Sequence, residues 1–126
     1  MSKIVYDTGA LLAAERQNPD FIKLHEQLKA RRIRPVVPIV VLAQSWRGGP
    51  QHRLSMVLKG CEILPGSERL GRAAGAACAA AGTTDVVDAI VVATAIAQGA
   101  SVITSDSGDL KLLADAIGVK LRLVPI

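Results

Sequence analysis

The stretch KIVYDTGALLAAE, residues 3–15, decides the fold. Its first part is apolar and rich in β-forming residues, and Asp7 ends it. A helical pattern follows directly over residues 8–15. The same order recurs at residues 101–106, SVITSD, where an apolar run ends in an aspartate and leads into another helical pattern. A strand that passes through an aspartate into a helix is the unit expected of a parallel α/β sheet.

This alternation continues along the whole chain. The pattern predicts strands near residues 3–6, 34–37, 61–64, 101–104 and 121–124. It predicts helices near residues 8–15, 19–31, 38–46, 51–59, 67–81, 85–98 and 107–117. We therefore expect an α/β fold, a three-layer α/β/α sandwich with a mainly parallel five-stranded sheet. No repeat, low-complexity tail or long linker interrupts it, which indicates one domain over residues 1–126.

Composition favours an aliphatic core without covalent staples. Half of the residues are hydrophobic, but the chain has only one Trp, one Tyr and one Phe. A domain of this size buries roughly two thirds of its unfolded surface, so Cys61 and Cys78 are interpreted as buried thiols and not as a disulfide. The apolar stretches are too short to span a bilayer, and the start Met1-Ser2-Lys3 has no signal-peptide pattern. We expect a cytoplasmic protein without a membrane partner.

Four aspartates are expected to converge at one edge of the sheet. Asp7 and Asp106 each follow a strand and precede a helix, which places both at the carboxyl edge, where ligands bind in such sheets. Asp85 and Asp88 are three residues apart and therefore share one helical face. Taken singly, Asp7, Asp85 or Asp106 is explained by helix capping. Asp88 interrupts an apolar run, and burying it without a partner would cost free energy. The four aspartates taken together therefore favour a metal site.

The ligand types narrow the chemistry of this site. Carboxylate oxygens with no His or Cys nearby indicate Mg²⁺ or Mn²⁺, and His25 and His52 are both expected at the surface. Asp109 is interpreted as a first-turn helix acid, with contact to the site through a water as the alternative. A metal held by carboxylates lowers the pKa of a bound water and clamps a phosphate, so that a phosphodiester is attacked in line. The products would carry a 5′-phosphate and a 3′-hydroxyl.

Three motifs carry a resemblance to a known family. They are Val5-Tyr6-Asp7-Thr8-Gly9-Ala10-Leu11-Leu12, Asp85-Val86-Val87-Asp88-Ala89 and Val102-Ile103-Thr104-Ser105-Asp106. In this order and spacing they resemble the PIN-domain nucleases, specifically the VapC-type toxins of bacterial toxin–antitoxin pairs. The resemblance implies a PIN-like fold, a magnesium-dependent endoribonuclease, a homodimer and inhibition by a VapB-type antitoxin. It also implies that Asp7, Asp88 and Asp106 form the catalytic, metal-binding triad, with Asp85 as an auxiliary acid.

One position departs from the family pattern. PIN domains usually carry a glutamate on the helix after the second strand, and the matching segment here offers Gln44. Glutamine can give a metal one neutral oxygen or hold a water, but it adds no charge and cannot act as a base. Either Asp85 compensates, or the metal binds more weakly, or catalysis is diminished; alternatively Gln44 is a plain surface residue. Glu15 is a poor substitute, because it lies about two helical turns beyond Asp7.

Basic and aromatic residues indicate how RNA could be bound. The net charge is +4, and because several acids belong to the proposed cluster, the remaining surface suits a polyanion. Trp46, Arg47 and Arg53 could stack a base and hold backbone phosphate, or Trp46 could instead pack on the core under Arg47. Thr8 and Ser105 flank the acids and could orient them or metal-bound waters.

The partner surfaces are expected on apolar helical faces. The faces at residues 22–28 and 54–58 could leave hydrophobic surface for a dimer or for an antitoxin helix. The main alternative to an endoribonuclease is a weakly active or inactive PIN-like protein that binds RNA or an antitoxin. Gln44 is the residue that keeps this alternative open.

Overall fold

The computed structural model describes residues 3–126, so the expectation drawn from Met1 and Ser2 lies outside the described residues. In that range five strands form one sheet in the order β3-β2-β1-β4-β5, and every pairing is parallel. The strands are β1 Lys3–Tyr6, β2 Val36–Pro38, β3 Glu62–Leu64, β4 Ala100–Thr104 and β5 Leu123–Pro125. The mainly parallel sheet expected from the sequence is thus parallel throughout the described chain.

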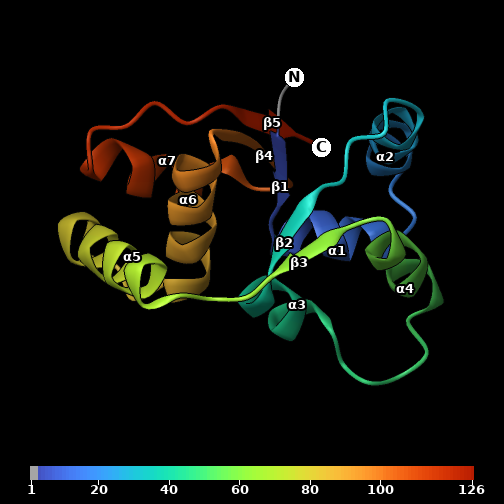
Figure 1. The fold of residues 1–126 in the computed structure, drawn as a ribbon, viewed down its shortest axis with the longest axis horizontal. Helices are drawn as coiled ribbons and strands as arrows, with labels where there is room; N and C mark the ends of the chain where they lie inside the picture. Colours follow the sequence, from blue (N-terminus) through green and yellow to red (C-terminus); the bar gives the residue numbers. More distant parts are fainter. Residues whose placement is uncertain (1–2) are drawn as a thin grey trace.

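The helices begin and end within two residues of their predicted bounds. They are α1 Thr8–Glu15, α2 Pro19–Ala30, α3 Ile39–Ser45, α4 His52–Lys59, α5 Glu68–Ala81, α6 Val86–Gln98 and α7 Ser107–Ala116. Figure 1 shows α5, α6 and α7 on one side of the sheet and α1, α2 and α4 on the other. Since both faces are covered, the central strands β1 and β4 are almost entirely buried, and the three-layer sandwich is confirmed.

The core is aliphatic except for one aromatic cluster between β1 and α2. The Tyr6 ring lies 5.2 Å from the Phe21 ring, and Phe21 stacks on His25 at 5.6 Å. His25 is buried at 7% exposure, so the expectation that it lies at the surface is wrong, whereas His52 is exposed as expected. Charged residues flank His25 in the sequence, which indicated a solvated position. In the structure His25 lies on the inward face of α2 with Phe21 and Leu28.

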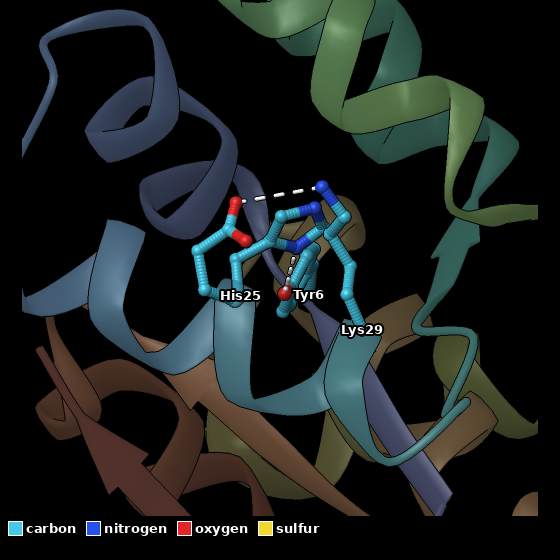
Figure 2. A network of polar contacts seen from close by, with 4 residues as sticks. Tyr6, His25 and Lys29 are labelled. Atoms are coloured by element: carbon cyan, nitrogen blue, oxygen red, sulfur yellow. Dashed lines mark hydrogen bonds and ion pairs between the residues drawn. The ribbon is translucent and has the colours of Figure 1, made fainter.

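A hydrogen bond accommodates the buried histidine. Tyr6 Oη lies 2.7 Å from His25 Nδ1 (Figure 2). Burial raises the pKa of Tyr6 and lowers the pKa of His25, with the nearby Lys29 ammonium adding to the second effect. The tyrosine hydroxyl therefore donates to a neutral imidazole, and the bond joins α2 to the central strand.

Two further expectations concern cysteines and membranes. Cys61 and Cys78 are both buried and free, which confirms that they form no disulfide with each other. Among residues 3–126 no single helix is both long enough and apolar enough to span a membrane. The helices α5 and α6 have the necessary length and apolar character only as a pair, and a bend of 117° separates them.

Candidate metal centre

Asp7 and Asp106 follow two neighbouring strands at the carboxyl edge of the sheet. Tyr6 pairs with Ile103 in the register of β1 and β4, and the Asp7 amide donates to the Ile103 carbonyl at 3.3 Å. Asp7 is 5% exposed. Burial raises the pKa of Asp7 and the nearby Asp106 carboxylate adds to this, while the Ala10 amide opposes it. The sheet therefore places both carboxylates at one end of the molecule, as the sequence predicted.

Three of the aspartates also cap the helices that follow them. Asp7 accepts from the Ala10 amide at 2.8 Å, Asp85 from the Asp88 amide at 3.2 Å, and Asp106 from the Gly108 amide at 3.1 Å. Each bond uses Oδ1, which fixes the side chain and leaves Oδ2 for another partner. Capping and metal binding, which appeared as alternatives in the sequence, are therefore compatible in one carboxylate.

Asp88 connects the acids on α6 and α7 with the acid on β1. Carboxylate oxygens of Asp85, Asp88 and Asp109 all lie within 4.8 Å of one another. The pKa of Asp88 rises to about 7 because the side chain is half-buried and because Asp85, Asp7 and Asp109 surround it. Burial and the surrounding acids thus disfavour the charged form of Asp88, and a positive charge close to it would favour that form.

Asp109 was interpreted from the sequence as a first-turn acid, with contact to the site through a water as the alternative. It does lie in the first turn of α7, but its carboxylate also belongs to the cluster with Asp85 and Asp88. The sequence held a signal for this, because Asp106 and Asp109 have the same spacing as Asp85 and Asp88, and both pairs open a helix. The spacing places Asp109 one turn along α7 from its cap, facing the start of α6.

The residues that meet here fit a divalent cation. They offer several hard oxygen ligands, and a bound cation would relieve the repulsion that raises the pKa of Asp88. A Gly at position 9 supports this geometry. An added Cβ there would overlap Ser105 Oγ and lie 3.2 Å from Ser105 Cβ, so the start of α1 approaches the loop before Asp106 more closely than another residue allows.

Gln44 and Glu15 have separate roles in the structure. Gln44 is exposed on α3, and its Oε1 accepts a hydrogen bond from Thr8 Oγ1, which places it beside the residue that follows Asp7. Glu15 accepts from the Leu54 amide at 2.9 Å and so caps the start of α4. Glu15 is thus engaged away from the acidic cluster, consistent with the expectation that it does not replace the missing glutamate.

The basic and aromatic candidates divide between two places. Trp46 is 40% exposed at the end of α3, and Arg47 folds back to donate to the carbonyls of Ala43 and Trp46, at 3.3 and 2.8 Å. Arg53 instead lines a groove of about 220 Å³ between α2 and α4. Trp46 and Arg47 are therefore close to Gln44, whereas Arg53 faces a different surface.

Comparisons with known proteins agree with this architecture. The family model described as the PIN domain matches residues 4–115. Among solved structures, VapBC2 from Rickettsia felis bound to a promoter DNA fragment superposes with a TM-score of 0.74, 20% identity and 98% coverage of each chain. DNA-bound VapBC from Salmonella typhimurium gives 0.73 and 18%, covering 99% of this chain and 98% of that one.

A third solved structure, PAE2754 from Pyrobaculum aerophilum, gives a TM-score of 0.66 at 15% identity, covering 97% of this chain and 83% of that one. None of the curated proteins searched matches the sequence. At these identities the solved structures establish a shared fold, and the family model establishes the kinship.

Proposed function

The chain belongs to the PIN-domain family, and from that premise we propose that it is a VapC-type toxin, a metal-dependent endoribonuclease using Mg²⁺ or Mn²⁺. The observation that carries the proposal is the convergence of acids from β1, α6 and α7 around Asp88, whose pKa rises to about 7. Carboxylate oxygens are the ligands that Mg²⁺ and similar cations take, and strongly shifted pKa values are typical of functional sites. Asp7, Asp88 and Asp106 are proposed as the catalytic, metal-binding residues, with Asp85 and Asp109 as auxiliary acids.

The chemistry assigns distinct tasks to these side chains. A divalent cation at this site would lower the pKa of a water molecule and offset the charge of an RNA phosphate. Asp7, Asp85 and Asp106 present Oδ2 in fixed positions, because their Oδ1 atoms are held by helix amides. Positive charge from a bound cation would favour the ionised form of Asp88, whose pKa burial and the neighbouring acids otherwise raise. Ser105 and Thr8 flank these acids and are proposed to orient them.

We propose an antitoxin and a second copy of the chain as protein partners. The solved structures from Rickettsia felis and Salmonella typhimurium are VapBC proteins, which supports a VapB-type antitoxin for this chain. Exposed apolar side chains on α2 and α4, Ile22 and Met56, border the groove that Arg53 lines and supply hydrophobic surface for such a partner.

A second candidate function is binding without efficient cleavage. It is favoured by Gln44, which stands where the family carries a glutamate and whose Oε1 already accepts from Thr8. A site with one acid fewer has less charge with which to hold a cation. Measured turnover distinguishes the two candidates.

The decisive experiment uses the purified chain free of antitoxin. It should cleave a structured RNA in Mg²⁺ or Mn²⁺, leaving 5′-phosphate and 3′-hydroxyl ends, and a chelator should stop the reaction. Asp7→Asn and Asp88→Asn should abolish cleavage with the far-ultraviolet circular dichroism unchanged, while the matched control Asp115→Asn on the exposed end of α7 stays active. Activity that survives both substitutions, or that survives the chelator, would refute the proposal. Products with a 2′,3′-cyclic phosphate would refute hydrolysis by water.

A further inference from the structure

The orientation of the Gln44 amide separates its two ends. Thr8 Oγ1 donates to Gln44 Oε1, so the oxygen that could ligate a cation already accepts a hydrogen bond. Gln44 Nε2 carries two N–H groups. Neither donates a hydrogen bond to another residue within residues 3–126. The side chain is exposed. Its free end therefore presents donors, which suit an anion, at the rim of the acidic edge.

Two stretches of the chain that supply the strands on either side of β1 differ in charge. Residues 73–110, which form most of α5 together with α6, β4 and the start of α7, contain no Lys or Arg and carry Asp85, Asp88, Asp106 and Asp109. Residues 27–61, which include β2, α3 and α4, contain no Asp or Glu. In the sheet, β4 and β2 flank β1 on opposite sides. A cation is attracted to the α6 and α7 side, and a phosphate is tolerated on the α3 side.

Arg47 strengthens this polarity. Its guanidinium folds back onto the carbonyl of Ala43, the residue before Gln44, at 3.3 Å. Arg47 therefore brings positive charge to the same helical turn of α3 as Gln44.

We propose that Gln44 donates its amide N–H groups to a non-bridging phosphate oxygen of the RNA and does not ligate the cation. The proposal rests on the endoribonuclease function above and deepens it, because it assigns the α3 side to the RNA backbone and the α6 and α7 side to the cation. Gln44 acts as a positioning residue for the phosphate, with Arg47 providing charge. At position 44 the glutamine then supplies hydrogen-bond donors where the family pattern has a negatively charged glutamate. This departure changes the role of the position from holding a cation to holding a phosphate.

Two binding measurements on the purified chain test this assignment without relying on turnover. Isothermal titration with Mn²⁺ alone reports on the cation. Fluorescence anisotropy of a labelled stem-loop RNA in Ca²⁺ reports on the phosphate contact. Gln44→Ala should leave Mn²⁺ affinity within about twofold and weaken RNA binding by about tenfold, the range of one hydrogen bond to a charged group. Gln44→Glu should weaken RNA binding further, because a carboxylate repels phosphate, while Mn²⁺ affinity does not fall.

Salt dependence separates a hydrogen bond from a charge. Gln44→Ala should keep the slope of log affinity against log salt, whereas Arg47→Ala should reduce it by about 0.7 to 0.9. Gln27→Ala, an exposed glutamine on α2, is the matched control and should change neither measurement.

The outcomes distinguish this inference from the proposed function. Loss of Mn²⁺ affinity by tenfold or more in Gln44→Ala without RNA would make Gln44 a cation ligand and overturn the inference. Unchanged RNA affinity in Gln44→Ala, or no RNA binding by the unmodified chain, would overturn it as well. A chain that shows the expected binding pattern but cleaves no RNA in Mn²⁺ would support the Gln44 assignment while refuting the nuclease proposal.

Discussion

Replacing Asp88 by asparagine should stabilise the cation-free protein while removing its response to metal. In the folded chain the Asp88 carboxyl is half-buried among Asp85, Asp7 and Asp109, and its pKa rises from 3.8 to about 7. At neutral and alkaline pH the folded state must therefore hold a charge that it disfavours. Asparagine is neutral at every pH, has nearly the same shape and can donate to Asp85 as the protonated acid does.

The magnitude follows from the pKa. A change from 3.8 to about 7 corresponds to about 4 kcal/mol at about 1.4 kcal/mol per pKa unit. Because water screens a half-buried side chain, we expect about 1 to 2 kcal/mol in practice. The carboxyl binds its proton more tightly in the folded than in the unfolded chain, so stability is highest below pH 4 and falls as pH rises from about 4 to about 7. The full gain from Asp88→Asn therefore appears above pH 7.

Thermal unfolding followed by circular dichroism checks this prediction. With a chelator at pH 8, Asp88→Asn should unfold about 4 to 8 °C above the unmodified chain, and at about pH 4 the gain should shrink to less than half. Adding Mn²⁺ at about one hundred times its dissociation constant should stabilise the unmodified chain by about 2.7 kcal/mol and leave the variant unchanged. Asp115→Asn, an exposed acid on α7, is the control and should shift neither curve appreciably. A variant less stable than the unmodified chain at pH 8 in chelator, or an equal gain at both pH values, would refute the electrostatic reasoning.

Three further substitutions probe other contacts. Gly9→Ala should destabilise the chain by about 1 to 2 kcal/mol in urea unfolding, since its Cβ meets Ser105; a Ser105→Ala partner that fails to recover any stability would contradict the steric cause. His25→Gln should make the free energy of unfolding less sensitive to acid below pH 6.5. Burial lowers the pKa of His25 in the folded chain, so protonation of this histidine as the pH falls favours the unfolded chain. Equal acid sensitivity in both proteins would contradict this reasoning. Glu15→Ala should lower the unfolding free energy by about 1 kcal/mol through the lost cap on Leu54, with Mn²⁺ affinity unchanged in titration; weaker Mn²⁺ binding would instead place Glu15 in the metal site.

The sequence predicted the sheet and the meeting of its strand-end acids for one physical reason. In a parallel α/β sheet every strand ends at the same edge, so Asp7 and Asp106 could be placed without knowing any side-chain contact. The order of the strands follows from which apolar faces pack on which helices, and the neighbouring positions of β1 and β4 came from the structure alone.

Asp109 and His25 show what local patterns leave out. Asp109 joins the cluster because α6 and α7 pack side by side. Its spacing from Asp106 repeats that of Asp85 and Asp88, but the spacing alone does not say which two helices will pack together. His25 is buried because Tyr6, nineteen residues away, supplies a donor to its ring. Burial of a polar side chain depends on a distant partner, whereas the pattern of flanking charges indicated only a solvated helix.

The double use of the aspartates affects how the proposed nuclease activity could be lost in evolution. Asp7, Asp85 and Asp106 begin three helices, so a descendant that no longer cut RNA would still be selected to keep them for folding. Within residues 3–126, neither Asp88 nor Asp109 caps a helix, and burial among the other acids disfavours the charged form of Asp88. In a related sequence, an asparagine at either of these two positions would therefore indicate lost nuclease activity more clearly than the state of the three capping aspartates does.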